Sequence, residues 1–178
     1  LCDWSSDVCS ADLDPERLSV VLDATDPGRT GKVAALMTGK VVNIDHHVSN
    51  THFADWEYIR TDCAATGEIL TELFTGWGAE ITPSMADALY MAIATDCGFF
   101  KFGNTTGHTL RMAALLVETG AAPNRVSERL EETTLVKINA LVKVLQRIEL
   151  FAGGRVAGIS FTEEVQRYTG EHTGGYID

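Results

Sequence analysis

Two short apolar runs, each followed at once by an aspartate, constrain the fold of this chain more than any other feature. Residues 18–22 (LSVVL) lead to Asp23, and residues 40–44 (KVVNI) lead to Asp45. Apolar runs of this length without alternation are typical of strands buried on both faces of a parallel sheet. The residues between them leave room for only a short helix or turn. The sequence therefore predicts two neighbouring parallel strands with an aspartate at the carboxyl end of each.

Helical periodicity dominates the middle of the chain. Thr82 followed by Pro83 is typical of a helix start, because Thr caps free backbone N–H groups and Pro fits the first turn. Gly120 is a typical helix stop. The helices predicted in this way span residues 64–77, 82–96, 107–120, 123–132 and 135–148.

The last part of the sequence changes period again. Residues 149–161 (ELFAGGRVAGISF) predict a hairpin that turns at Gly153 and Gly154, and a short helix is predicted to start at Thr162. Parallel strands early, helices in the middle and a closing hairpin together indicate an α/β domain with a mostly parallel sheet flanked by helices.

Titratable side chains follow the predicted strands. Ligands of open parallel sheets bind outside the carboxyl ends of the strands, which is where Asp23 and the Asp45-His46-His47 cluster fall. Asp96 is a third candidate, at the point where a predicted helix gives way to a Gly-containing loop. Carboxylate and imidazole groups suit a divalent first-row metal such as Mn²⁺. The pattern therefore predicts a metal site at this edge of the sheet.

Each candidate also has a purely structural interpretation. An aspartate after a strand is more often a turn former or a helix cap, and adjacent histidines also occur on ordinary surfaces. Asp26, beside Pro27 and Gly28, is interpreted as turn chemistry. The remaining histidines are interpreted as surface or loop residues: His52, His108 and His172. The prediction of a site rests on the combination.

Charge and composition narrow the partners. The 14 Lys+Arg against 25 Asp+Glu give a formal net charge of −11. Because a protein that grips long nucleic acid usually carries a basic face, long duplex nucleic acid is excluded as a partner, and any phosphate substrate is expected to be short. No apolar run is long enough for a membrane span, and no secretory signal is recognisable, so a cytoplasmic location is expected. Cys63 and Cys97 are expected to be buried small hydrophobes.

The two ends of the sequence are unusual. Residues 1–13 (LCDWSSDVCSADL) show no clear period and resemble a translated sequencing-adapter fragment, so they are predicted to be a non-native artefact. Residues 14–170 are predicted to form the domain, and residues 171–178 to begin a linker. The expectation is a chain shortened on both sides.

Four motifs resemble, in order, those of the DHH phosphoesterases. They are VVLDATD at 20–26, NIDHHVSNTHFAD at 43–55, AATGEI at 64–69 and the stretch from ATDCGFF to VETGA at 94–121. The bacterial bifunctional oligoribonuclease and 3′-phosphoadenosine-5′-phosphate (PAP) phosphatase branch, the nanoRNase group, is the most similar. The resemblance covers about residues 14–178 and implies a Rossmann-like DHH catalytic domain and a metal-dependent hydrolase.

The resemblance also implies roles for single residues. Asp23 matches the ligand that bridges two Mn²⁺ ions, and His46 and Asp96 match ligands of one of those ions. His47 matches the histidine that faces the substrate phosphate. Asp45 is expected to orient His46 and His47 without binding the metal itself. Arg29, Lys101, Asn104 and Thr105 are further candidate phosphate contacts, with a solvated loop role as the equal alternative.

The sequence departs from the family in two places. The family's first motif, a strand that ends in Asp-x-Asp with a nearby His, is missing before Asp23, as is the C-terminal substrate domain with its Gly-Gly-Gly-His loop. At most one well-formed Mn²⁺ site is therefore expected, and the chain as given is expected to be nearly inactive.

The leading interpretation is a two-Mn²⁺ phosphoesterase that acts on short oligonucleotides or nucleotide phosphates, and a homodimer through helical surfaces is compatible with it. Alternatives are an inorganic pyrophosphatase or exopolyphosphatase of the same superfamily, and a non-catalytic module that binds metal or nucleotide.

Overall fold

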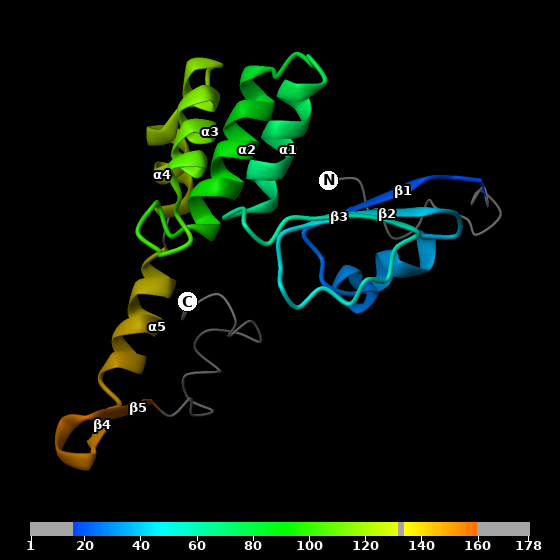
Figure 1. Cartoon of the computed structure of the whole chain (residues 1–178). Helices are drawn as coiled ribbons and strands as arrows, with labels where there is room; N and C mark the ends of the chain where they lie inside the picture. The colour runs from blue at the N-terminus through cyan, green and yellow to red at the C-terminus, as the bar shows by residue number, and fades with distance from the viewer. Residues whose placement is uncertain (1–15, 132–133, 160–178) are drawn as a thin grey trace. The chain divides into compact units, whose positions relative to one another are not determined.

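The computed structural model describes residues 16–131 and 134–159 (Figure 1). The chain divides into two compact units, Leu1–Val126 and Ser127–Asp178. Each unit is built differently, and the candidate site lies wholly within the first.

The first unit opens with a parallel three-stranded sheet in the order β1-β2-β3. β1 spans Ser19–Leu22, β2 Val41–Asp45 and β3 Trp56–Ile59. The two predicted strands are confirmed, and their register pairs Leu22 with Ile44. β3 was not predicted from the sequence, because its four residues (WEYI) include a glutamate and form no apolar run. Its register pairs Asp45 with Ile59.

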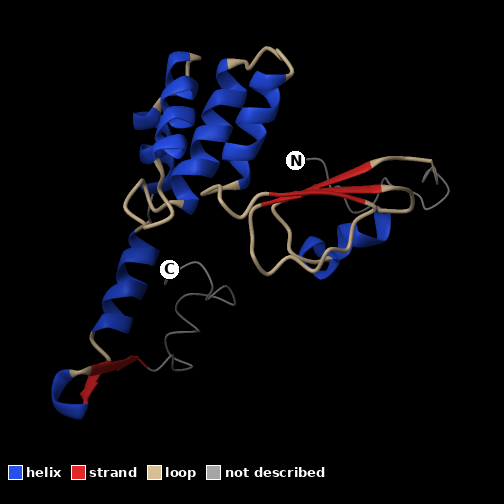
Figure 2. Cartoon of the chain, viewed as in Figure 1, coloured by secondary structure: helices blue, strands red, loops and turns tan. Residues whose placement is uncertain are grey.

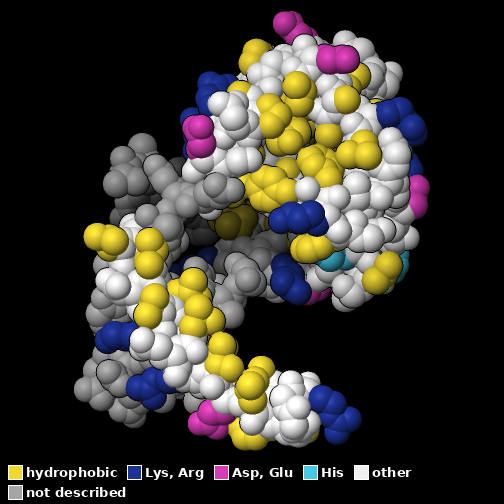
Figure 3. Space-filling view, turned by 90° about the vertical axis from the view of Figure 1, so that its left-hand side faces the viewer, with side chains coloured by type: hydrophobic (Ala, Val, Ile, Leu, Met, Phe, Trp, Pro, Cys, Tyr) yellow, Lys and Arg dark blue, Asp and Glu magenta, His cyan; other side chains and the backbone are white. Residues whose placement is uncertain are grey.

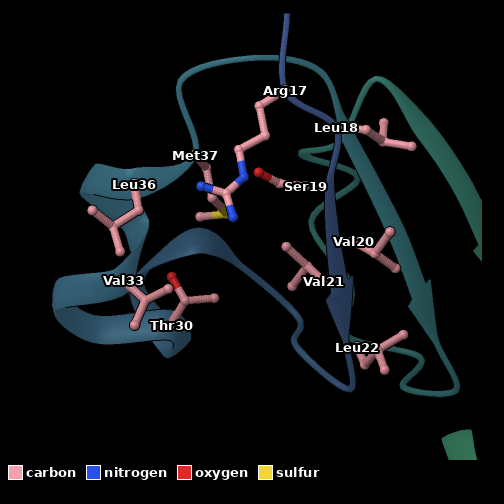
Figure 4. A pocket seen from close by; sticks show the side chains of 10 residues that line it. All are labelled: Arg17, Leu18, Ser19, Val20, Val21, Leu22, Thr30, Val33, Leu36 and Met37. Atoms are coloured by element: carbon pink, nitrogen blue, oxygen red, sulfur yellow. The ribbon is translucent and has the colours of Figure 1, made fainter. Parts of the chain in front are cut away.

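The expectation that both faces of these strands are buried is wrong for β1. Val21 is buried, whereas Leu18, Val20 and Leu22 are 54%, 56% and 46% exposed. Figure 4 shows the reason: Val21 points toward the short 3-10 helix η2, and the other three side chains point to the opposite side. Successive strand residues face opposite sides of a sheet. In the described residues only one of these sides is covered along β1.

η2 spans Pro27–Leu36 and fills the connection between β1 and β2. Its N-cap is Asp26, whose side chain accepts a hydrogen bond from the Gly28 backbone N–H. This confirms the interpretation of Asp26 as turn chemistry. Between η2 and β1 lies an open pocket of about 440 Å³, lined in part by Val21, Val33 and Leu36.

Three helices follow the sheet (Figure 2). α1 spans Thr66–Gly76, α2 Pro83–Asp96 and α3 Gly107–Glu118, in agreement with the prediction. The Thr82 side chain caps α2 by accepting from the Met85 backbone N–H. Gly120 follows α3 with φ 116°, a conformation that favours glycine.

The core of the first unit lies between these helices. Ile93 and Leu116 are fully buried there. Close helix contact depends on Gly67, because a Cβ at that position would lie 2.8 Å from the Ala92 Cβ. A second, smaller cluster packs Ile69 and Cys63 against Ile44 of β2. Cys63 and Cys97 are both free and buried, as predicted.

The helix α4 (Pro123–Glu131) crosses the boundary between the units, and the second unit contains α5 (Leu135–Leu145) and an antiparallel hairpin. The hairpin joins β4 (Ile148–Phe151) and β5 (Val156–Ile159) through a short turn, η3 (Ala152–Gly154).

Gly153 and Gly154 have φ 69° and 85°, so the predicted turn position is confirmed. Hydrophobic side chains are visible along α5 and the hairpin in Figure 3. The helix predicted from Thr162 lies outside the described residues. No helix in the described part of the chain is long and apolar enough to cross a membrane.

Candidate metal centre

The carboxyl ends of β1 and β2 and the end of α2 bring three predicted metal ligands together. The Nε2 atom of His46 lies 3.5 Å from Oδ1 of Asp23 and 3.4 Å from Oδ2 of Asp96. These separations are longer than strong hydrogen bonds and match donor atoms that share one ion, since each donor then lies about 2.0–2.2 Å from the metal. The rule that ligands bind at the carboxyl ends of parallel strands predicted that Asp23 and His46 lie together, whereas Asp96 comes from the end of a helix.

Asp23 is held by its backbone and by a neighbouring hydroxyl. Its φ of 60° is left-handed, a conformation that aspartate tolerates better than most residues. Its backbone N–H still donates to the Ile44 carbonyl, so the residue stays attached to β2. The Thr66 hydroxyl donates to Asp23 Oδ1 over 2.8 Å. One carboxylate oxygen is thus fixed by the first turn of α1.

Asp96 is the last residue of α2 and lies in an electrostatically unfavourable place. Burial raises the pKa of its carboxyl group, and the nearby Asp23 carboxylate raises the pKa further, while His46 and His47 act in the opposite direction. The carboxyl end of a helix also disfavours negative charge. A bound cation would remove this repulsion between the two carboxylates.

Asp45 is fully buried, and hydrogen bonds occupy both of its oxygens. Oδ1 accepts from the backbone N–H of His46 at 2.8 Å and lies 2.7 Å from Nδ1 of His47. Oδ2 accepts from the Asn50 side chain at 2.7 Å. Burial alone would raise the pKa of Asp45, but the hydrogen bonds from His47, Asn50 and the backbone outweigh it and lower the pKa. Asp45 is therefore an ionised anchor rather than an accessible ligand.

His47 is oriented by that anchor. Because a carboxylate can only accept, the Nδ1 atom of His47 carries the proton of this hydrogen bond. Its ring lies beside that of His46, with centroids 4.3 Å apart, and is 41% exposed. The Nε2 atom is consequently the ring nitrogen that remains for a ligand.

Two different sets of three side chains could hold a metal ion at this centre. Asp23, His46 and His47 offer ligand atoms that all lie within 4.8 Å of one another. Asp23, His46 and Asp96 share the Nε2 atom of His46 as their common neighbour. We favour the second set, because Asp45 already uses His47 Nδ1 and Asp96 offers a carboxylate with no such bond among the described residues.

The candidate phosphate contacts separate into two pairs. The Asn104 amide donates to the backbone carbonyls of Ala64 and Asp96, both at 3.3 Å, so it fixes the loop after α2. The hydroxyl of Thr105 is buried and has no hydrogen-bond partner within the part of the chain that the structure describes. Among the described residues, the charged ends of Arg29 and Lys101 make no ion pair with the cluster. Their role in phosphate binding stays a prediction.

The other histidines differ from one another. His52 is exposed, with Nδ1 2.6 Å from Glu57, as a surface residue should be. His108 was wrongly assigned to the surface or a loop: it lies in the first turn of α3, and its Nε2 is 3.4 Å from Glu72 and 3.8 Å from Glu68. The reason is that the α3 start packs on α1. His172 lies outside the described residues.

Some residues that support the centre were missed in the sequence. Glu68 is buried and accepts from the Ala64 backbone N–H and the Thr109 hydroxyl, which joins the start of α1 to α3. Asn43, inside an apolar strand, donates to backbone carbonyls that flank Asp23. An uncharged polar residue within an apolar run was the available signal for Asn43. Glu68 gave none, since a helical glutamate is usually exposed.

Comparison with known proteins gives the family of this arrangement. The model of the "DHH family, N-terminal domain" matches residues 5–93. The match begins inside the stretch 1–13 whose non-native origin stays a prediction.

The bifunctional oligoribonuclease and PAP phosphatase NrnA of Thermus thermophilus is 31% identical over 152 residues, which cover 85% of this chain and 46% of the relative. The Bacillus subtilis protein of the same name is 28% identical, over 77% of this chain and 45% of the relative. The chain thus spans about half the length of the curated relatives it matches.

A solved structure shows the same fold. The exopolyphosphatase-related protein of Bacteroides fragilis superposes with a TM-score of 0.79 at 19% identity, over 89% of this chain and 48% of that one. Because the likeness covers most of this chain, it extends well beyond the three-stranded sheet.

Proposed function

Because the chain belongs to the DHH family, we propose that the protein to which it contributes hydrolyses phosphoester bonds in short oligonucleotides or nucleotide phosphates, with Mn²⁺ as its metal. The observation that carries this proposal is the position of His46 Nε2 between Asp23 and Asp96, at 3.5 and 3.4 Å. The names of the relatives from Thermus thermophilus and Bacillus subtilis, oligoribonuclease and PAP phosphatase, supply the substrate class.

The donor set fits the metal. Two carboxylates and one imidazole are ligands that a divalent first-row ion accepts, and no thiolate is among them. Asp23, His46 and Asp96 would hold the ion. When bound, such an ion polarises a phosphoryl oxygen and lowers the pKa of bound water. A bound cation would also offset the repulsion from Asp23, which adds to burial in raising the pKa of Asp96.

The residues around these ligands would orient the substrate. Asp45 keeps Nδ1 of His47 occupied, so the exposed Nε2 is the atom left to contact a phosphate oxygen. In its doubly protonated form the ring donates from Nε2 while Nδ1 stays on Asp45. Thr66 holds Asp23 from α1, so that its carboxylate does not rotate away. These contacts would fix the geometry before substrate arrives, and such positioning lowers the entropic part of the reaction barrier.

The charge of the chain limits the substrate. With a formal net charge of −11, the protein has no excess of cations to neutralise a long phosphate backbone. A short substrate requires only local contacts, which His47 and the metal would supply. A cytoplasmic location and a homodimer belong to the same proposal.

Mn²⁺ binding to the full chain tests the proposal directly. His46→Ala removes the donor shared by the two carboxylates, and we expect its Mn²⁺ affinity, followed by electron paramagnetic resonance, to fall at least tenfold. His52→Ala is the matched control, because His52 is an exposed histidine paired with Glu57. Equal affinities of His46→Ala and the unaltered chain would contradict the metal assignment.

Substrate comparison tests the reaction. Hydrolysis of the dinucleotide pApA, of PAP and of pyrophosphate should be measured with Mn²⁺ in long incubations, because low turnover is expected of this chain. Preference for pApA or PAP supports the proposal. Preference for pyrophosphate would place the protein with inorganic pyrophosphatases. Tight Mn²⁺ binding with no hydrolysis by either this chain or a version extended to the length of the relatives would identify a binding module.

A further inference from the structure

Two asparagines bracket the Asp-His-His segment and meet behind it. Asn43 is fully buried in β2, two residues before Asp45, and Asn50 lies in the loop five residues after it. The Asn50 amide nitrogen donates to Oδ1 of Asn43 at 2.8 Å and to Oδ2 of Asp45 at 2.7 Å. The orientation of the Asn50 amide is fixed by chemistry, because the Asp45 carboxylate can only accept.

The same two side chains hold the turn that carries Asp23. The Asn43 amide donates to the carbonyls of Val21 and Ala24, each at 3.3 Å, which lie on either side of Asp23. Asn50 approaches the Ala24 carbonyl as well, at 3.4 Å. Asp23 has a left-handed backbone and needs such support, because an isolated residue would relax from it.

From these contacts we infer that Asn43 and Asn50 are positioning residues that set the distance between Asp23 and His47. One continuous chain of hydrogen bonds leads from the backbone around Asp23, through Asn43 and Asn50, to Asp45 and then to Nδ1 of His47. Thr51 extends it, since its backbone N–H and its hydroxyl both donate to the Thr25 carbonyl at 2.8 Å. These hydrogen bonds tie the loop after β1 to the loop after β2.

Burial shows why ordinary packing is an insufficient explanation. A buried amide without partners costs free energy, so an apolar residue at position 43 would serve a strand better if stability alone were needed. Instead, the Asn43 amide donates to the turn that carries Asp23, and the Asn50 amide donates to Asn43 and to Asp45. The inference about metal and phosphate placement rests on the proposed function, whereas the hydrogen-bond chain itself does not.

The first test uses the metal-free full chain. In a sample labelled with ¹⁵N-histidine, His47 should give a downfield Nδ1–H resonance because that proton is held by Asp45. Asn50→Ser removes the amide donors, and we expect the resonance to shift or to be lost through exchange with water. Asn139→Ser is the control, because Asn139 is an exposed asparagine on α5. An unchanged resonance in folded Asn50→Ser would overturn the inference.

The second test measures Mn²⁺ affinity. Asn43→Ser and Asn50→Ser should each weaken binding about tenfold, as is typical for residues that orient metal ligands. The double variant should bind Mn²⁺ almost as tightly as the single variant with the lower affinity, because both residues belong to one chain of hydrogen bonds. Fully additive losses, or no losses, would contradict the inference.

Two safeguards keep the outcomes distinct. If Asn50→Ser fails to fold, Asn50→Asp is the second variant. It keeps the side-chain volume and the acceptor for the His52 backbone N–H, but it replaces the amide donors by a carboxylate that faces Asp45. The same losses of the His47 resonance and of Mn²⁺ affinity are expected. If the unaltered chain binds no Mn²⁺, the proposed function fails, while the His47 resonance still decides whether the asparagines position this histidine.

Discussion

The helical core and the strand ends of the first unit are both buried, but they are built from different interactions. Between α1, α2 and α3 most fully buried side chains are apolar, such as Ile93 and Leu116, and the polar exceptions are Glu68, Thr71 and Thr109. Behind the candidate metal centre, Asn43 and Asp45 are fully buried. Both accept a hydrogen bond from the Asn50 amide. The first region stabilises the fold because apolar surface is removed from water. In the second region, hydrogen bonds hold the side chains of the candidate metal centre in position.

The largest effect is expected in the helical core. Ile93→Ala leaves a cavity between the helices and should lower the free energy of unfolding by about 2–5 kcal/mol. Urea unfolding followed by circular dichroism measures this loss. Mn²⁺ affinity, measured well below the unfolding midpoint, should stay within twofold. A tenfold fall in affinity would show that the two regions are not separable.

A pH dependence is expected where the regions meet. Burial, followed by the Glu68 charge, raises the pKa of Cys63 from 9.0 to about 11. The unfolded chain therefore loses this proton at lower pH than the folded chain, so stability falls as pH rises from about 9 to 11, by on the order of 2 kcal/mol. Burial also raises the pKa of Tyr90, with the same sign.

Cys63→Ala is the check on this assignment. Urea unfolding at pH 8 and at pH 10.5 should show a smaller difference in the variant than in the unaltered chain, with the Tyr90 part remaining. An identical pH dependence in both proteins would remove Cys63 as its source.

An intermediate effect is expected at the strand ends. Asp45→Asn keeps the shape but removes the charge that accepts from the backbone N–H of the ligand His46 and from His47 Nδ1. It should weaken Mn²⁺ binding by about 10–100-fold, which corresponds to about 1.4–2.7 kcal/mol. Isothermal titration measures the affinity. Asp55→Asn is the control, since Asp55 is a surface carboxylate that binds Lys40 and the Val41 backbone. Equal losses in both variants would point to a general charge effect.

The smallest effect is expected on the uncovered face of β1. Val20→Thr keeps a β-branched side chain at a position that is 56% exposed, so the free energy of unfolding should change by no more than about 0.5 kcal/mol. Urea unfolding of the two proteins side by side tests this. A loss of about 2 kcal/mol would show that Val20 is covered in solution.

The sequence predicted those features that depend on periodicity and on one topological rule. Helix starts at Thr82 and stops at Gly120 follow from capping chemistry, and parallel strands necessarily place Asp23 beside His46 at one edge. β3 was missed because its four residues have no apolar period. The prediction that β1 is buried on both faces was wrong, because a run of apolar residues does not show which face of a sheet packs against other elements.

The supporting side chains lay beyond such rules. Asn43 and Asn50 are seven positions apart, and only the folded chain shows that they share one hydrogen bond. His108 and Glu68 come from different helices, and their proximity depends on how α3 packs against α1. Sequence patterns describe one element at a time, whereas these contacts are properties of pairs of elements.

The left-handed backbone of Asp23 restricts which residues evolution or a protein engineer could place there. Glycine, asparagine and aspartate adopt a φ near 60° more readily than most residues, and of these three only aspartate carries a carboxylate. Glutamate has the right charge and a longer reach, yet its backbone would resist this conformation. Ligand chemistry and backbone sterics therefore both favour aspartate at position 23.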